Sequence, residues 1–359
     1  MPEISVIIPI LNSATTLERC LESVRSQTFH DWEALCVYDD SLDDSKKIIA
    51  KTVREDTRFV FVQGRNINLA AARNDGIKAA TGKYIFFLDS DDALLPNAFE
   101  RCYKEFLRRT CDIVVFGTEI LPDIPRASDW YYRVLQTRNK FYRKFSEKAL
   151  FLENSARPFV WRNAFLKDFL DENELFFDET CFVGEDQVFQ LCAFPNVQNG
   201  ISFIKEELYQ YTWTRSGSLM AEFNKDILFR LRGHIHMVDS VFRYWAFRNY
   251  DNLSKADIAV WCIYFLGWEI PYLPKDKIDA LAKPIDKLFL TWLVAALLNE
   301  LPNTIRCIAI NLQNHIALQP NRWRHLKELL CWERYWGGVW KAGRFLIFKI
   351  VRFVLRRSL

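Results

Sequence analysis

The chain has 359 residues, half of them hydrophobic and 15% aromatic, and a formal net charge of +3. It is too long for one small domain and can supply a sizeable core. Its nine cysteines include no CxxC pair and several lie in apolar runs, which favours buried free thiols over disulfides or a zinc site. Because we find neither a signal peptide nor an apolar run of ~18 residues, we expect a cytoplasmic protein.

Short apolar runs alternate with amphipathic stretches over the first part of the chain, which predicts βαβ units and a parallel sheet. The expected strands cover residues 4–8, 34–38, 59–63, 84–88 and 112–116, and the expected helices cover residues 15–27, 45–54, 70–80 and 96–109. Pro9 is expected to end the first strand.

The rest of the chain is less regular. Between about residues 121 and 200 we expect the sheet and the site to be completed, and after about residue 223 the periodicity is helical. The break at Ser216-Gly217-Ser218 marks the expected boundary. We therefore predict a catalytic domain over residues 1–220, a helical region over 221–340 and a separate segment over 341–359.

The most informative run is Lys-Tyr-Ile-Phe-Phe-Leu-Asp-Ser-Asp-Asp at residues 83–92. Its apolar part is typical of a strand buried on both faces, so the acids should lie at the carboxyl edge of the sheet, where open α/β folds bind ligands. On extended chain Asp89 and Asp91 would face the same side and could share Mg²⁺ or Mn²⁺, cations that complete their shells with water and substrate phosphates. A solvated turn after a strand is the alternative.

Two further residues are expected at the same edge. Asp39 follows the second strand and could accept a hydrogen bond from a nucleotide base or ribose. For the nearby Asp43 and Asp44, an Asx-turn or a helix N-cap is favoured. Arg73 could neutralise diphosphate charge, with a surface helix arginine as the alternative.

An acidic pair, Glu185-Asp186, follows Gly184 in an otherwise apolar stretch. A carboxylate held near a reacting hydroxyl can serve as a general base. A pair of acids at the start of a helix is the alternative, because such acids satisfy free backbone N–H groups there.

Six motifs occur in one order along the chain. They are residues 5–12, residues 26–29, Asp39 with Ser41 and Asp43, residues 72–77, residues 82–92 and residues 184–186. In these motifs the chain resembles inverting glycosyltransferases of family 2 with the GT-A fold, of the bacterial surface-polysaccharide type. The resemblance is strong over about residues 1–120, fair to about residue 220, and absent from the last third.

The resemblance implies a GT-A fold, with a Rossmann-like, mostly parallel sheet flanked by helices and followed by a helical region. It implies transfer of a sugar from a UDP-sugar to a hydroxyl of a glycan or lipid-linked glycan, as in polysaccharide or lipopolysaccharide assembly, with Mn²⁺ or Mg²⁺ as cofactor. Asp186 would deprotonate the acceptor beside Glu185, and Asp89 and Asp91 would hold the metal. The residues implied to bind the nucleotide sugar are Pro9, Asn12, Asp39, Arg73, Asp89, Ser90, Arg215 and Ser218.

Two positions depart from the family pattern. Asn68 stands where the family commonly has Gly, and because Asn tolerates a left-handed backbone, the turn is expected to survive. Arg162-Asn163 follows Trp161 where the family often has a basic residue slightly further on, which affects the acceptor side and leaves the donor chemistry intact.

Residues 341–359 hold six basic residues and no acid. At ~100° per residue, five of the six fall on one arc of a helix, which is typical of a helix lying on an anionic membrane surface. We therefore expect peripheral association with the inner face of the cell membrane. A helix that packs on the protein's own core or on a dimer partner is the alternative, and no nucleic-acid recognition motif accompanies the charge.

Two other functions are alternatives to glycosyl transfer. A phosphatase of the haloacid dehalogenase type also has a DxD after a buried strand, but there the nucleophile follows the first strand, and the residue after Asp92 is Ala93. A catalytically silent membrane-bound scaffold would not need every acid of the family pattern, and here all are present.

Overall fold

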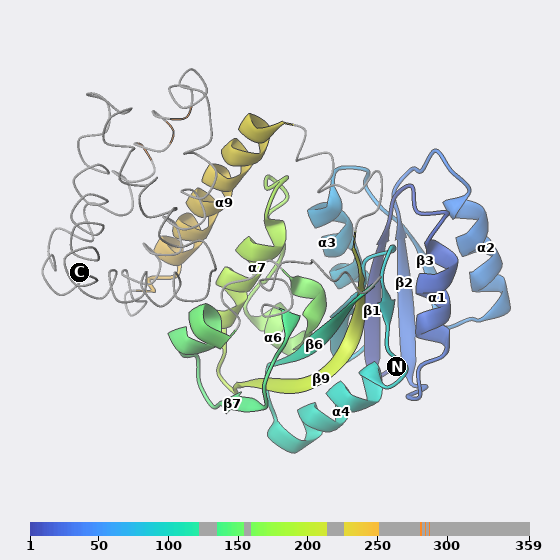
Figure 1. The fold of residues 1–359 in the computed structure, drawn as a ribbon, viewed down its shortest axis with the longest axis horizontal. Coiled ribbons are helices and arrows are strands. Elements are labelled where there is room, and N and C mark those ends of the chain that lie inside the picture. The colour runs from blue at the N-terminus through green and yellow to red at the C-terminus, as the bar shows by residue number, and fades with distance from the viewer. Residues whose placement is uncertain are drawn as a thin grey trace, which may run out of the picture. The chain divides into compact units, whose positions relative to one another are not determined.

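The computed structural model describes residues 1–121, 135–153, 159–213 and 226–250, together with Leu281, Pro284 and Lys287 (Figure 1). The chain divides into two compact units, Met1–Ser218 and Leu219–Leu359. In the second unit the structure describes helix α9, Ile227–Phe247, which begins where the Asp226 carboxylate accepts hydrogen bonds from two backbone N–H groups. None of the described helices is both long enough and apolar enough to span a bilayer.

The first four strands form the parallel part of the sheet, in the order β3-β2-β1-β4. They are β1 (Ile4–Ile10), β2 (Trp32–Tyr38), β3 (Phe59–Gln63) and β4 (Tyr84–Phe87). Helices α1 (Leu17–Arg25), α2 (Ser45–Glu55) and α3 (Leu69–Ala79) connect them. The predicted βαβ units are therefore confirmed, and each boundary of these strands and helices lies within two residues of the prediction.

Beyond β4 the sheet is mixed and continues in the order β8-β6-β9-β5. Its strands are β5 (Ala93–Leu94), β6 (Ile113–Leu121), β7 (Lys140–Tyr142), β8 (Asn163–Leu166) and β9 (Ile201–Thr212). Strand β8 lies antiparallel between β4 and β6, whereas β6 and β9 are parallel. The predicted GT-A class is confirmed, and the continuous run of parallel neighbours is β3-β2-β1-β4.

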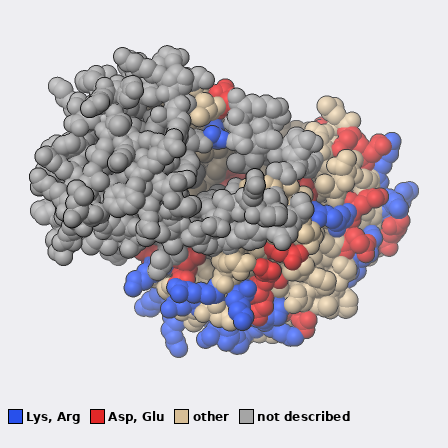
Figure 2. All heavy atoms as spheres, in the orientation of Figure 1, with Lys and Arg blue, Asp and Glu red and all other residues tan. Residues whose placement is uncertain are grey.

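The other described helices follow the strands of this mixed part. They are α4 (Ala98–Arg109), η1 (Lys148–Glu153), η2 (Val160–Arg162), α6 (Lys167–Glu172), α7 (Glu185–Ala193) and η3 (Phe194–Asn196). Figure 2 shows acidic and basic side chains interspersed over the described surface on this face, in keeping with the near balance of 48 basic and 45 acidic residues.

The prediction that Pro9 ends the first strand was wrong. Pro9 and Ile10 continue to pair with β2, whereas pairing with β4 stops at Ile7. The Ile7 carbonyl accepts from Leu88 N at 3.0 Å and so faces β4. Pro9, two residues on, faces the same side beyond the last β4 pair, so its missing N–H removes no bond from that ladder.

Alternating side chains of the sheet build a core on each face. Ile4, Val6 and Ile8 of β1 share one cluster with residues of α1, α2 and α4. On the opposite face α3 packs so closely on β1 that a Cβ at Gly76 would lie 2.3 Å from Ile7 Cγ2. This close approach brings the middle of α3 against the sheet and positions Arg73 in the interior.

Candidate active site

One buried arginine connects three carboxylates at the carboxyl edge of the sheet. Arg73 is 1% exposed, and its Nη2 donates to Asp89 Oδ1 at 2.9 Å. Its Nη1 donates to Glu185 Oε1 at 3.0 Å and also to Asp186 Oδ1. The structure thus brings together four predicted site residues from three elements, and we call them the Arg73 cluster. Three acids around one guanidinium leave an excess of negative charge.

Asp186 is the second residue of α7. The helix begins directly after Gly184, which has a left-handed backbone with φ of 78°. The side chain is buried, and its Oδ2 accepts a hydrogen bond from Val160 N at 3.4 Å. Burial raises the pKa of Asp186 well above its ordinary value, although the Arg73 charge opposes that shift. The negative charge of Glu185 raises the pKa of Asp186 further.

The acids after β4 lie in a turn, so the assumption of extended chain at Asp89–Asp91 was wrong. Asp92 N donates to the Asp89 carbonyl at 3.0 Å and closes the turn. The Asp89 carboxylate is directed at Arg73, and the Ser90 hydroxyl contacts Ser13 Oγ at 2.6 Å. The predicted edge position is confirmed, but the two acids do not present one face by strand alternation.

The chemistry of this turn fits a divalent cation that is shared with a ligand. Asp89 and Asp91 offer hard carboxylate oxygens, and Mg²⁺ and Mn²⁺ sites are commonly built from one or two carboxylates plus phosphate oxygens and water. Within the described ranges, no three His, Cys, Asp or Glu side chains gather as a protein-only metal site.

Asp39 lies at the same edge, directly after β2, and is 7% exposed. Its Oδ1 accepts from Asn66 N at 3.0 Å, and a Cβ at Gly64 would stand 2.2 Å from that oxygen. Burial raises the pKa of the Asp39 carboxyl, and the Asn66 hydrogen bond opposes the shift. Only glycine at position 64 leaves room for the carboxylate in this position.

Asn12 and Asp43 join the loops that follow β1 and β2. Asn12 has a left-handed backbone with φ of 51°, and its Oδ1 accepts from Leu42 N at 2.8 Å. Asp43 accepts from Ser45 N at 3.0 Å and from Ala14 N at 2.8 Å. The local role favoured for Asp43 is confirmed.

The left-handed turn expected at Asn68 was wrong. Asn68 is extended, with φ of −171°, and its side chain caps α3 by accepting from Ala71 N at 2.9 Å. The left-handed residue is Asn66, with φ of 55°. At the second departure from the family pattern, Arg162 is fully buried in η2, and Trp161 stacks on Tyr209 with ring centroids 4.4 Å apart.

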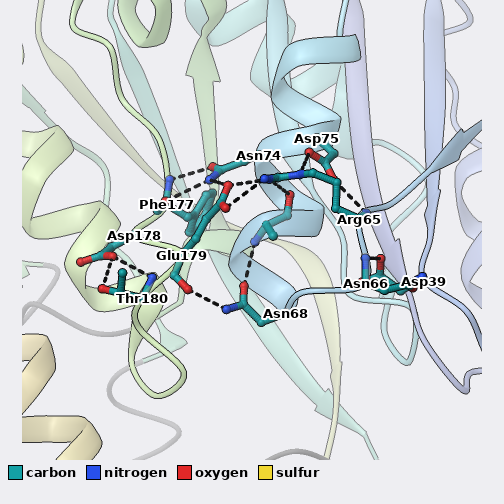
Figure 3. A network of polar contacts seen from close by, with 11 residues as sticks. Asp39, Arg65, Asn66, Asn68, Asn74, Asp75, Phe177, Asp178, Glu179 and Thr180 are labelled. Atoms are coloured by element: carbon teal, nitrogen blue, oxygen red, sulfur yellow. Dashed lines mark hydrogen bonds and ion pairs between the residues drawn. The ribbon is translucent and has the colours of Figure 1, made fainter.

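A second polar network lies beside this edge and was not predicted (Figure 3). Arg65 pairs with Asp75 at 2.7 Å and with Glu179 at 2.5 Å. Asn74 Nδ2 donates to Glu179 Oε1 at 3.0 Å and to the Phe177 carbonyl at 2.9 Å. We call these side chains the Arg65 cluster. No sequence motif marks the link between residues 65 and 179, and the motif at residues 72–77, which contains Asn74, gives no signal for it.

Two predicted nucleotide-binding residues, Arg215 and Ser218, lie outside the described residues, as does the whole of residues 341–359. Pro9 lies within β1, and Ser90 and Asp91 occupy the turn after β4. The site roles of these residues remain predictions.

Comparison with known proteins gives a family match and several relatives. Residues 5–172 match the family model described as Glycosyl transferase family 2. EpsH of Bacillus subtilis (strain 168), named as a glycosyltransferase, is 31% identical over 213 residues, which cover 58% of this chain and 60% of EpsH. The chain thus spans about 60% of the length of the first curated relatives it matches.

Solved structures show the same fold. S. aureus TarS 1–349 in complex with UDP-GlcNAc has a TM-score of 0.61 at 17% identity, covering 99% of this chain and 92% of that one. The mannosyltransferase PcManGT from Pyrobaculum calidifontis, in complex with GDP-Man and Mn²⁺, has a TM-score of 0.50 at 14% identity, covering 100% and 88%. The fold agrees with the family match, which covers residues 5–172 of the chain.

Proposed function

We propose that the protein is a metal-dependent, inverting glycosyltransferase that moves a sugar from a UDP-sugar to a hydroxyl of a glycan or lipid-linked glycan acceptor. The observation that carries the proposal is the Arg73 cluster, which brings a buried acid, Asp186, next to the acids that follow β4. A candidate base and a candidate donor site are thereby joined through one guanidinium.

The donor is proposed to lie along the carboxyl edge of the parallel strands. Asp39 would accept from the base, because one of its oxygens is already engaged by Asn66 and the other can receive an imide N–H. Asp89 and Asp91 would hold Mn²⁺ or Mg²⁺, and that cation, when bound, would supply Lewis-acid stabilisation of the leaving diphosphate. The UDP-GlcNAc of TarS and the GDP-Man and Mn²⁺ of PcManGT support a nucleotide-sugar donor.

Asp186 is proposed to act as the general base. It removes the proton of the acceptor hydroxyl as that oxygen attacks the anomeric carbon from the face opposite the nucleotide. The new C–O bond forms while the bond to the diphosphate oxygen breaks, so the configuration inverts in one displacement. Arg73 favours the ionised form that this step needs, because its charge lowers the pKa of Asp186 against the effect of burial.

The structure argues against the phosphatase. The nucleophile of that class follows the first strand, but β1 is followed by Leu11 and Asn12, and neither is an acid. The acids instead follow β4, after three other strands of the chain. A catalytically silent scaffold would have no use for a buried excess of carboxylates, because unpaired buried charge is destabilising.

A donor screen tests the proposed function. The full chain would be incubated with Mn²⁺ and UDP-glucose, UDP-galactose or their N-acetyl and uronic forms, and slow hydrolysis would be followed as UDP release. We expect one donor to be turned over, and we expect Asp91→Ala or excess chelator to abolish turnover, because diphosphate facing carboxylates needs a cation between them.

Asp44→Asn is the matched control, since Asp44 is an exposed acid that pairs with Lys47. It should leave turnover unchanged. Full activity in chelator, after verified removal of metal, would contradict the metal requirement. Failure of every nucleotide sugar to bind would contradict the function itself.

Membrane association is proposed for residues 341–359 from their sequence alone. Each basic residue near an anionic surface contributes about 1 kcal/mol, and the attraction weakens with salt. Deletion of residues 341–359 should abolish co-sedimentation with anionic vesicles at low salt and leave UDP release unchanged. Equal sedimentation of both forms would assign the segment to the core or to a dimer interface.

A further inference from the structure

A third acid, Asp92, anchors the turn that carries Asp89 and Asp91 to strand β9. Asp92 is 1% exposed and points away from the Arg73 cluster toward β9. Its Oδ2 accepts from Tyr209 Oη at 2.7 Å, and its Oδ1 accepts from Thr212 N at 2.7 Å. Both carboxylate oxygens are therefore used within the protein, which leaves Asp92 unsuited to bind a ligand directly.

Tyr209 holds the turn at both ends. Its buried phenol oxygen donates to Asp92 and accepts from Asp89 N at 3.2 Å. One hydroxyl thus bridges the first and last residues of Asp89–Asp92, and Asp92 N closes the same turn on the Asp89 carbonyl at 3.0 Å. The position of the hydroxyl is in turn fixed by the stacking of the Tyr209 ring on Trp161.

The middle of the turn is held by its backbone. The Asp91 carbonyl accepts from Thr212 Oγ1 at 2.6 Å and from Arg19 Nη2 at 2.6 Å. Contacts from β9 and α1 therefore fix the backbone on either side of the Asp91 side chain.

We propose that Asp92 and Tyr209 are positioning residues that hold the Asp89–Asp91 turn in the conformation that binds a divalent cation together with a nucleoside diphosphate. The inference rests on the proposed function, which supplies the cation and the diphosphate. Neither residue touches the ligand: Asp92 is occupied by β9, and Tyr209 acts through the backbone N–H of Asp89 and the carboxylate of Asp92.

The test is the Mn²⁺-dependent binding of UDP to the full chain, measured by isothermal titration calorimetry with and without Mn²⁺. Tyr209→Phe keeps the ring that stacks on Trp161 and removes only the bridging hydroxyl. We expect UDP affinity in Mn²⁺ to fall about tenfold, as for loss of a buried hydrogen bond, and the weak affinity without Mn²⁺ to stay unchanged. Asp92→Asn should show the same pattern.

Tyr142→Phe is the matched control. Its phenol donates to Glu153 Oε1 at 2.8 Å, the same kind of bond, but on β7 and away from the turn. This variant should bind UDP as the wild type does in both conditions. Circular dichroism at the assay temperature establishes that each variant is folded.

Three outcomes separate the hypotheses. Wild-type affinity in Mn²⁺ for both Tyr209→Phe and Asp92→Asn would overturn the positioning role. An equal loss of affinity with and without Mn²⁺, or loss of folding in both variants, would make the two residues merely structural and overturn it as well. A wild-type chain that binds no UDP in any condition would instead overturn the proposed function.

Discussion

The Arg65 cluster and the Arg73 cluster are each built around one arginine paired with acids, but they differ in exposure and in charge balance. Arg65 precedes α3 and Arg73 lies within it, and each arginine pairs with acids from the segment around residues 179–186. The Arg65 side chain is 41% exposed and pairs with two acids, whereas Arg73 is buried and pairs with three. Exposure and charge balance, rather than residue type, distinguish the two.

The two clusters differ in how their carboxylate charges are balanced, and this difference indicates which of them is suited to bind a ligand. In the Arg65 cluster, the Asn74 amide donates a second hydrogen bond to the Glu179 carboxylate, and the arginine is partly exposed to water. In the Arg73 cluster, three carboxylates depend on one buried cation, an arrangement that is costly unless something else offsets it. A cation and a diphosphate would change that balance, so perturbing each cluster should have very different effects.

Removing the Arg73 charge should have the largest effect. Arg73→Gln leaves three acids without their cation, and we expect turnover of the nucleotide sugar to fall by on the order of 10³-fold, the upper range for loss of one preorganised group. The melting temperature should fall too, because breaking a buried ion pair costs about 3–5 kcal/mol. Steady-state kinetics and thermal unfolding would measure both. Retention of a tenth of the activity would remove the basis for contrasting the clusters.

Removing the proposed base should be the next largest change. Asp186→Asn keeps the size of the side chain but cannot take a proton, so kcat should fall on the order of 10²-fold or more. The affinity for the donor should stay close to that of the wild type, as measured by calorimetry with the UDP-sugar. If donor affinity collapses while turnover at saturation survives, Asp186 is a donor ligand.

The pH dependence of kcat compares the influence of the two clusters on Asp186. Because its folded pKa is raised by burial, kcat should fall as the pH drops through a value above the usual carboxylate range of ~4. Glu185→Gln removes a negative neighbour that raises this pKa, so the acid limb should move to lower pH. Glu179→Gln, in the Arg65 cluster, should leave the limb where it is. An unmoved limb in Glu185→Gln would show that another group controls the profile.

Disrupting the exposed cluster should have the smallest effect. Arg65→Gln breaks two partly exposed ion pairs, so we expect a loss of about 1 kcal/mol or less in the free energy of unfolding. Turnover should stay within about threefold of the wild type, the scale of a change below 1 kcal/mol. Denaturant unfolding and kinetics would measure these. A loss comparable with that of Arg73→Gln would erase the distinction between structural and functional clusters.

The parallel half of the fold could be predicted because its strands and helices have strong local patterns. β3 was predicted to the residue, and the buried positions of α1 follow helical spacing. The mixed half could not be placed in the same way. β8 has four residues, and its pairing with β4 and β6 depends on neighbours far away in the sequence.

The site was predictable in its residues but not in its contacts. The acids after β2 and β4 do lie at the expected edge, because the carboxyl ends of parallel strands meet at one edge of the sheet. The pairing of Arg73 with Glu185 spans 112 positions, and no local pattern encodes it. The turn at Asp89 and the cap at Asn68 were missed because each depends on a hydrogen bond from a backbone N–H, of Asp92 and Ala71 respectively, that residue types alone do not specify.

The antiparallel insertion of β8 between β4 and β6 has a consequence for biosynthesis. As the chain leaves the ribosome, β1–β4 can assemble early, but one edge of β4 has no partner until Asn163–Leu166 emerges. An unpaired strand edge is a template for association with other chains. The nascent protein must therefore keep that edge covered while residues 88–166, roughly a fifth of its length, are made, and slow translation over this stretch would prolong the exposure.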